Sequence, residues 1–219
     1  MICPHCGIGF HESPYEKLID EDPDGGWILV HDRCPECKKL IIQLKKGTPI
    51  YNASRSFSGV TKYEMILVRP KGTYHPPCPS DVPDDYAEDY KEACLVLADS
   101  PKASAALSRR CLQNILRNVA KVNHGKLYDE IEEILDRKTL PSHIAESIDA
   151  VRSIGNFAAH PMKSKSTGEI IDVEPGEAEW NLDVLEALFD YYFVQPEKTK
   201  KRKDALNKKL KEVDKSIIK

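Results

Sequence analysis

The spacing of hydrophobic positions changes near residue 84 of the chain. Before that point the apolar residues come in short runs of β-branched and bulky side chains, bounded by Gly, Pro and Asp. Such runs are typical of β-strands. They lie at Gly26–Val30, Leu40–Leu44 and Tyr63–Val68. The polar, turn-rich stretch from Gly47 to Gly59 indicates a longer loop between the last two strands.

From Asp84 onward the apolar residues recur at helical spacing. Ser100 followed by Pro101 predicts a helix start, because serine caps a helix and proline is tolerated at its first position. The pattern predicts five helices and a basic sixth. The first helix begins at Asp84, and the next four cover Ser100 to Val122, Leu127 to Leu135, Leu140 to Pro161 and Pro175 to Tyr192. The sixth is indicated by a sparse apolar stripe made of Leu206, Leu210, Val213 and Ile217.

These patterns divide the chain into four parts. We predict a β module over residues 1–75, a proline-rich linker over 76–83, a helical bundle over 84–195 and a basic helical tail over 196–219. Short loops between helices favour antiparallel neighbours, so an up-and-down bundle is expected. The predicted fold class is mainly α.

Composition places the protein among ordinary globular proteins. The chain has 219 residues, of which 41% are hydrophobic and 31% charged. No apolar run approaches the roughly 20 residues that span a bilayer, and the start of the chain is not a signal peptide. We therefore expect a cytoplasmic protein without membrane association. In that compartment its seven cysteines indicate metal ligands or buried small side chains rather than disulfides.

Charge is unevenly distributed along the chain. The net charge is −3, but the segment from Glu197 to Lys219 has ten Lys/Arg and four Asp/Glu, a net of +6. The remainder therefore carries −9. A basic tail on an acidic body is consistent with an anionic partner, an acidic subunit or a well-solvated chain end.

Four of the cysteines form two CxxC pairs. Cys3 and Cys6 are separated by 27 residues from Cys34 and Cys37. Two such pairs present four thiolates to one tetrahedral Zn²⁺ and leave no position for water, so they predict one structural zinc ion per chain and a zinc-ribbon-like module. A redox dithiol is the alternative, and His5 and His11 are the nearest other ligands.

A polar stripe lies near the end of the fourth predicted helix. Arg152, Asn156 and His160 are spaced i, i+4 and i+8, so they share one side of that helix. Arginine suits a phosphate, asparagine can orient a substrate and histidine moves protons near neutral pH. The alternative is structural: the first two bond neighbouring loops while His160 caps the helix. Chemistry alone favours this structural role.

Several segments resemble a bacterial family called domain of unknown function 4145. They are Ser100–Gln113, Gly125–Leu127, Leu140–Pro141 and Arg152–His160. The likeness covers most of residues 80–195, and that family in turn resembles the HEPN superfamily. This resemblance implies a mainly α fold, a HEPN-like up-and-down helical bundle preceded by a small β zinc-ribbon-like module, and a homodimer.

The resemblance also implies a candidate activity. Many HEPN members are metal-independent ribonucleases in which Arg and His motifs meet across the dimer. By that analogy His160 is the acid/base, Arg152 the transition-state clamp and Asn156 the residue between them. Seven residues separate Arg152 from His160, one more than the family pattern usually allows, so Arg109 or Arg110 is an alternative cation.

Two hypotheses therefore remain open. The first is a metal-independent endoribonuclease that acts as a homodimer. The second is a non-catalytic module with a structural zinc ribbon that binds nucleic acid, a nucleotide or a protein partner.

Overall fold

The chain forms two compact units. The computed structural model describes residues 1–71, 75–159, 162–163, 170–171, 174–213 and 215–218, and the side chains of all these except 153–159, 162–163 and 170–171. The first unit is Met1–Pro77 and the second is Cys78–Lys219.

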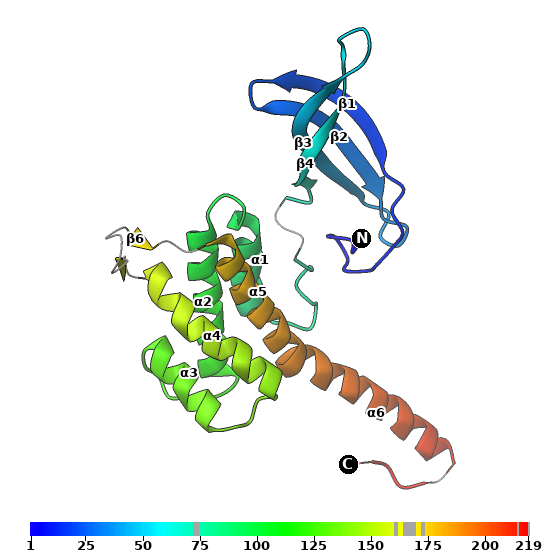
Figure 1. Ribbon diagram of the computed structural model, residues 1–219. Helices are drawn as coiled ribbons and strands as arrows, with labels where there is room; N and C mark the ends of the chain where they lie inside the picture. The colour runs from blue at the N-terminus through cyan, green and yellow to red at the C-terminus, as the bar shows by residue number, and fades with distance from the viewer. Residues whose placement is uncertain (72–74, 160–161, 164–169, 172–173, 214, 219) are drawn as a thin grey trace. The chain divides into compact units, whose positions relative to one another are not determined.

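The first unit contains a four-stranded antiparallel sheet with strand order β1-β2-β3-β4 (Figure 1). Its strands are β1 (Tyr15–Asp22), β2 (Gly25–Arg33), β3 (Leu40–Tyr51) and β4 (Phe57–Arg69). Side chains along β2 alternate between the two faces of the sheet, as the pleat requires. Ile28 and Val30 are 5% and 3% exposed, whereas Trp27, Leu29 and His31 between and beside them are half-buried. At β2, one face of the sheet is therefore buried and the other, half-buried face is the more open one.

Sequence reasoning underestimated this sheet. It missed β1, because the sequence YEKLIDED is mostly charged and all eight of its residues are exposed at the edge of the sheet. It also placed a loop at residues 47–59, where β3 continues to Tyr51 and β4 begins at Phe57. Backbone pairing across this long hairpin tolerates polar side chains, since the ladder joins N–H and C=O groups whatever the side chain is.

The second unit is helical. Its helices are α1 (Asp84–Val96), α2 (Pro101–Asn118), α3 (Leu127–Asp136), α4 (Ser142–Ala159), α5 (Pro175–Phe189) and α6 (Gln195–Glu212). A five-residue π-helix, η1 (Asp190–Val194), joins α5 to α6, and a short pair of strands, β5 (Met162–Lys163) and β6 (Ile170–Ile171), follows α4.

Capping residues begin two of these helices. The hydroxyl of Ser100 accepts a hydrogen bond of 3.3 Å from the backbone N–H of Ala103, and Pro101 occupies the first position of α2. This confirms the helix start predicted from sequence. At α5, Glu174 and Glu177 form a reciprocal capping box in front of the helix that Pro175 opens.

The core of the second unit surrounds α2, which contacts each of α1, α3, α4 and α5. Its centre is fully buried aliphatic side chains, namely Leu112, Ile115, Leu116, Ile131, Ile134, Ile148, Leu182, Leu185 and Leu188. Aromatic rings extend it between α1 and α5, where Tyr90 and Phe189 meet edge to face at 5.5 Å. The hydroxyl of Tyr90 donates to Glu186 at 2.8 Å. Helices α1 to α5 therefore share one continuous core.

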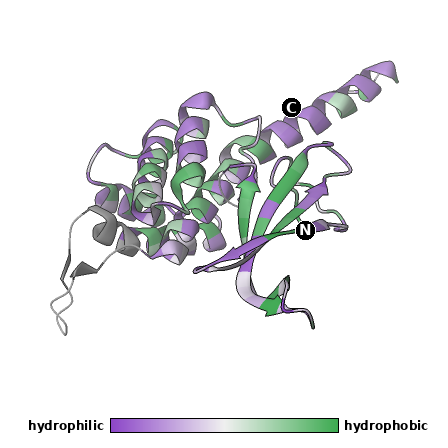
Figure 2. Cartoon of the chain, turned by 90° about the horizontal axis from the view of Figure 1, so that it is seen from above, coloured by the Kyte–Doolittle hydropathy of each residue, from purple (hydrophilic) through white to green (hydrophobic). Residues whose placement is uncertain are grey.

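The π-helical turn before α6 has a local cause in the sequence. Pro196 lacks an N–H group, and in a regular α-helix its ring would collide with the carbonyl four residues earlier. The backbone widens there, so that Gln195 N–H donates to the carbonyl of Asp190. Beyond this turn α6 leaves the other helices of its unit (Figure 1). None of its residues is buried, and Figure 2 shows it as mainly hydrophilic.

The predicted fold class, a mainly α protein consisting of a HEPN-like up-and-down bundle with a small β addition, is wrong. The chain is 47% helix and 23% strand, a mixed α and β composition in which the sheet fills most of its own unit. The error follows from the polar strand β1 and the long β3–β4 hairpin, which hydrophobic periodicity does not reveal. None of the helices in the described part of the chain has the length and hydrophobicity that crossing a membrane requires.

Candidate functional site

The two CxxC segments adopt the same backbone conformation. In the first, the N–H of Gly7 donates to the carbonyl of Cys3 at 2.9 Å; in the second, the N–H of Lys38 donates to the carbonyl of Cys34 at 3.0 Å. The residue after each pair has a positive φ, 74° at Gly7 and 59° at Lys38. Glycine reaches this conformation without strain, and Lys38 adopts it because the turn requires it. Each turn therefore presents two sulfurs on one side.

The four sulfurs converge on one point. The Sγ atoms of Cys3, Cys6, Cys34 and Cys37 all lie within 4.8 Å of one another. The Sγ atoms of Cys3 and Cys37 are 3.8 Å apart, as are those of Cys6 and Cys34. Zn–S bonds of about 2.3 Å in a regular tetrahedron give sulfur–sulfur edges of about 3.8 Å. Four cysteines therefore lie close together in a geometry that can bind a metal ion.

Backbone amides donate hydrogen bonds to the sulfurs, which lowers the pKa of the thiols, whereas burial raises it. The N–H of His5 donates to Sγ of Cys3 at 3.4 Å, although burial raises the pKa of Cys3 to about 12. Burial also acts to raise the pKa of Cys34, but amide hydrogen bonds from Cys37 and Glu36 outweigh it and lower that pKa to about 7. Such amide donors are the usual second shell of thiolate metal sites.

Neither histidine near the cysteines joins the group. Nε2–H of His5 donates to the carbonyl of Leu40 at 2.8 Å, which ties the first turn to the start of β3. The ligand group contains neither His5 nor His11. The four-cysteine set proposed from sequence is therefore complete without an imidazole, and a closed set of this kind has no vacant position for catalysis.

Little apolar surface supports this region of the first unit. Around the sulfurs, the buried cluster consists of Cys3, Cys34 and Ile41, with Met1, Phe10 and Leu67 packed against it. A core of this size contributes few kcal/mol, so a bound ion would supply much of the stability of the turns.

The other three cysteines have different surroundings. Cys111 is fully buried, and its thiol lies 3.4 Å from the carbonyl of Tyr86. Cys78 and Cys94 are half-buried and pack against the helical core. The sequence expectation for Cys111, a buried small side chain, is confirmed.

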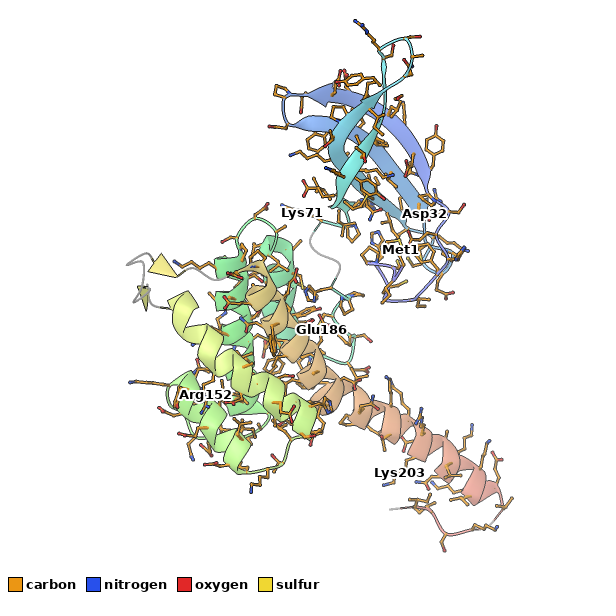
Figure 3. All side chains as sticks on the ribbon, in the orientation of Figure 1. Met1, Asp32, Lys71, Arg152, Glu186 and Lys203 are labelled. Carbon is orange, nitrogen blue, oxygen red and sulfur yellow. The ribbon has the colours of Figure 1, made fainter. Side chains whose placement is uncertain are left out.

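The predicted Arg–Asn–His stripe is described only at its first residue. The Arg152 guanidinium on α4 (Figure 3) forms an ion pair with Asp149 at 2.7 Å and lies 4.9 Å from the centre of the Tyr128 ring. His160 lies outside the described residues, and so does the side chain of Asn156. The catalytic role of this stripe stays a prediction.

The two alternative arginines on α2 differ from each other. Arg110 binds the carboxylate of Asp89 through two side-chain nitrogens, with Nε at 3.0 Å from each carboxylate oxygen. Asp89 is only 6% exposed, so this pair holds α2 to α1. Arg109 is half-buried, burial lowers its pKa, and it has no hydrogen bond or ion pair with the part of the chain that the structure describes. Among the described residues, Arg110 is therefore neutralised by a carboxylate and Arg109 is not.

Helix α6 has more basic residues than any other helix or strand in the described chain. It has eight Lys/Arg and three Asp/Glu among 18 residues. Only two of its cations form ion pairs with described residues: Lys200 with Glu197 at 3.6 Å, and Lys201 with Asp81 at 3.5 Å. Figure 3 shows Lys203 among side chains that project from this helix on all sides.

The predicted apolar stripe of the tail is interrupted. The helix ends at Glu212, so Val213 and Ile217 lie beyond it, and both are exposed. The chain turns back there, and the side chain of Asn207 exchanges two hydrogen bonds with the backbone of Ile218. A continuous helix-pairing stripe is therefore absent from the tail as described.

Sequence reasoning missed the aromatic residues on the open face of the sheet. Lys46 Nζ lies 5.2 Å from the centre of the Trp27 ring, and the rings of Tyr15 and His31 are 5.1 Å apart. Tyr15 lies on the strand that was not predicted, so no pattern in the sequence would have paired it with His31.

Comparison with known proteins identifies a family for the second unit. The model of the family described as domain of unknown function (DUF4145) matches residues 91–212, more than half of the chain and the whole of α2 through α6. No curated protein and no solved structure matches the chain significantly. The family resemblance seen in the sequence is confirmed, without support for the wider HEPN relationship. This chain belongs to the DUF4145 family.

Proposed function

We propose that this protein binds nucleic acid through the basic helix α6 and that the four cysteines hold a structural Zn²⁺. The observation that carries the first proposal is an 18-residue helix with eight basic residues and no buried side chain. A helix of this length is stable in water mainly when something packs against it. Its charge favours a polyanion as that partner, because Lys and Arg dominate sequence-independent binding to phosphates.

The basic residues of α6 are concentrated rather than scattered. At 3.6 residues per turn, five of them fall within an arc of about 120°. They are Lys198, Lys201, Arg202, Lys208 and Lys209. The helix is about 27 Å long, so this face can contact several consecutive phosphates. The matched family segment includes all of α6, so the basic helix is part of the family domain.

Zinc is proposed from the donor set and its size. Thiolates favour zinc over magnesium or calcium, and the two 3.8 Å sulfur–sulfur distances suit Zn–S bonds. When bound, the ion joins the N-terminal turn to the β2–β3 connection. Its role is to hold the first unit folded.

The binding proposal predicts a salt-sensitive interaction. Full-length protein should bind a labelled 20-nucleotide RNA. Replacing four basic residues of α6 with Gln should weaken this binding. It should also reduce the slope of log K against log salt concentration by about 3. The four are Lys198, Arg202, Lys208 and Lys209. Fluorescence anisotropy between 50 and 300 mM salt (roughly the range where phosphate contacts dominate) measures both quantities.

A control variant removes the same charge elsewhere. It replaces the exposed lysines Lys39, Lys62, Lys102 and Lys138 with Gln. Unchanged binding in this control, together with loss in the α6 variant, supports the proposal. Equal losses in both would mean that net charge alone is responsible and would remove the role of α6.

A second candidate function is RNA cleavage, favoured by the half-buried Arg109, which pairs with no carboxylate among the described residues. In this candidate, His160 moves protons while an arginine stabilises the phosphorane formed when the 2′-hydroxyl attacks its own phosphate. Cleavage should proceed in EDTA, leave 2′,3′-cyclic phosphate ends and fall at least about 100-fold in His160→Ala. Arg109→Gln should lower cleavage as well, while Arg110→Gln should act mainly on stability. Retention of full cleavage by His160→Ala would refute this candidate.

A further inference from the structure

We propose that the open face of the N-terminal sheet binds the bases of single-stranded nucleic acid by stacking. This inference rests on the nucleic-acid-binding function proposed above and assigns it a second contact surface. We call this surface the aromatic face. It consists of Tyr15 and Lys17 on β1, Trp27, Leu29 and His31 on β2, Ile42, Leu44 and Lys46 on β3, and Ile66 on β4.

Strand register places these residues together. Directly paired residues of antiparallel strands lie on the same face of a sheet. Leu29 pairs with Lys17 on one side and Leu44 on the other, and Leu44 pairs in turn with Ile66. The rows on either side are Tyr15–His31–Ile42–Arg69 and Asp20–Trp27–Lys46–Glu64, so charged residues lie at the ends of these rows. The aromatic face is therefore an apolar centre with aromatic rings at both ends.

The aromatic face is more accessible than the opposite face at its centre, although Leu18 and Tyr63 on the edge strands of the opposite face are 42% and 54% exposed. Tyr15 is 59% exposed and Ile66 is 38% exposed. At the centre of the opposite face Ile28, Val30 and Ile41 are each at most 5% exposed, whereas Leu29 and Leu44 at the centre of the aromatic face are half-buried. Exposed apolar surface that persists on one face of a folded sheet usually marks a binding site.

The chemistry of the aromatic face favours nucleic acid over a protein partner. The cores of protein–protein interfaces are depleted in lysine, whereas here Lys46 lies over the Trp27 ring and Lys17 pairs with Leu29. An aromatic ring next to a cation can stack on a base while the cation binds the neighbouring phosphate. Trp27 with Lys46 has this arrangement, with 5.2 Å between the Nζ atom and the ring centre.

Spacing and charge further restrict the ligand. Trp27 and His31 are four residues apart on one strand, a separation of about 13 Å, which accommodates bases bound at both ends. Asp20 and Glu64 border the Trp27 row and disfavour a continuous phosphate track there. Bases in a duplex are stacked on one another and cannot lie on these rings. The preferred ligand is therefore single-stranded.

Two exposed tyrosines provide a matched pair of variants. Tyr15 is on the aromatic face, and Tyr63, 54% exposed, lies with Lys45 at 4.7 Å from its ring. Lys45 pairs with Ile28, so this second ring belongs to the opposite face. Tyr15→Ser should weaken binding of a 20-nucleotide oligo(U) by roughly 5- to 100-fold, the effect of losing one stacked base. Tyr63→Ser should change it less than about 2-fold, and both variants should bind the corresponding duplex like the unchanged protein.

Tryptophan fluorescence provides a test that does not require an aromatic-face substitution. The chain has two tryptophans, and Trp180 on α5 is 45% exposed, so Trp180→Phe leaves Trp27 as the only tryptophan. Oligo(U) should quench the emission of Trp27 with the same midpoint as the anisotropy titration, and duplex should not.

The outcomes separate the two proposals. If oligo(U) binds through α6 but leaves Trp27 emission unchanged, or if Tyr15→Ser and Tyr63→Ser have equal effects, the inference about the aromatic face is overturned while the role of α6 stands. If the unchanged protein binds neither oligo(U) nor duplex, the proposed function and the inference fail together.

Discussion

Replacing Cys34 with serine is expected to abolish metal binding and to unfold much of the first unit. The sulfur cluster is supported by a single fully buried aliphatic residue, Ile41. A structural zinc ion typically contributes about 10–16 kcal/mol to the folding of a small module, more than the few kcal/mol that this core can supply. The helical unit has its own core and should remain folded.

Metal content and NMR spectra of the full-length protein test this expectation. Cys34→Ser should lose the bound zinc and the dispersed amide signals of the sheet while keeping those of the helices. Cys94→Ser is the control, because Cys94 lies on α1 outside the CxxC pairs. A strong chelator should reproduce the effect of Cys34→Ser, and lower pH should weaken metal binding because the ligands are thiolates. Intact sheet signals in metal-free Cys34→Ser would contradict the proposed dependence.

Replacing Glu130 with alanine is expected to destabilise the second unit by about 3 kcal/mol. Glu130 is 1% exposed on α3. Its carboxylate accepts hydrogen bonds from Nε of Arg117 at 2.7 Å and from the N–H of Gly125 at 2.8 Å. The substitution would leave Arg117 without its carboxylate and the Gly125 amide without its acceptor. Loss of one partner from a buried ion pair costs more than the pair contributes.

Thermal unfolding measures this effect and separates its causes. For a unit of this size, about 3 kcal/mol corresponds to a decrease in Tm of roughly 10 °C. Glu146→Ala on the exposed side of α4 is the control and should change Tm little. The double variant Glu130→Leu with Arg117→Leu should recover much of the loss, since it removes both charges. A Tm for Glu130→Ala within about 1 °C of the unchanged protein would show that the pair has no structural role.

The two proposed contact surfaces, the aromatic face and helix α6, bind different parts of a single-stranded nucleic acid. The positive charge of the helix attracts any phosphate backbone, whereas the aromatic rings stack only on unpaired bases. The two contributions differ in salt dependence, so they can be measured in one protein. Neither contribution depends on the proposed catalytic role of Arg152 and His160.

Much of the helical unit could be predicted from the sequence. The start of α2 at Ser100–Pro101 and that of α5 at Pro175 follow from local capping chemistry, which a few neighbouring residues determine. The CxxC pairs were equally local, because each is a tight turn whose two sulfurs point the same way. These features need no knowledge of distant parts of the chain.

The sheet was harder to predict for a physical reason. An edge strand such as β1 is stabilised by backbone pairing with β2 and can carry charged residues throughout. Such a strand has no hydrophobic periodicity that would reveal it. Its omission is one reason why the chain, which is mixed α and β, was predicted to be mainly α. The π-helical turn at Asp190–Val194 was likewise missed, although Pro196 marks its end.

By itself, the sequence determined the four clustered cysteines, the helix starts, the family and the basic character of α6, since each depends on residues that are close in the chain or on charge alone. Tertiary structure decided which of the two neighbouring arginines on α2 is already neutralised, because Asp89 on α1 pairs with Arg110. It also brought Tyr15 to His31 and Trp27 to Lys46. Such pairings depend on strand register and helix packing, which place side chains together only after the chain has folded.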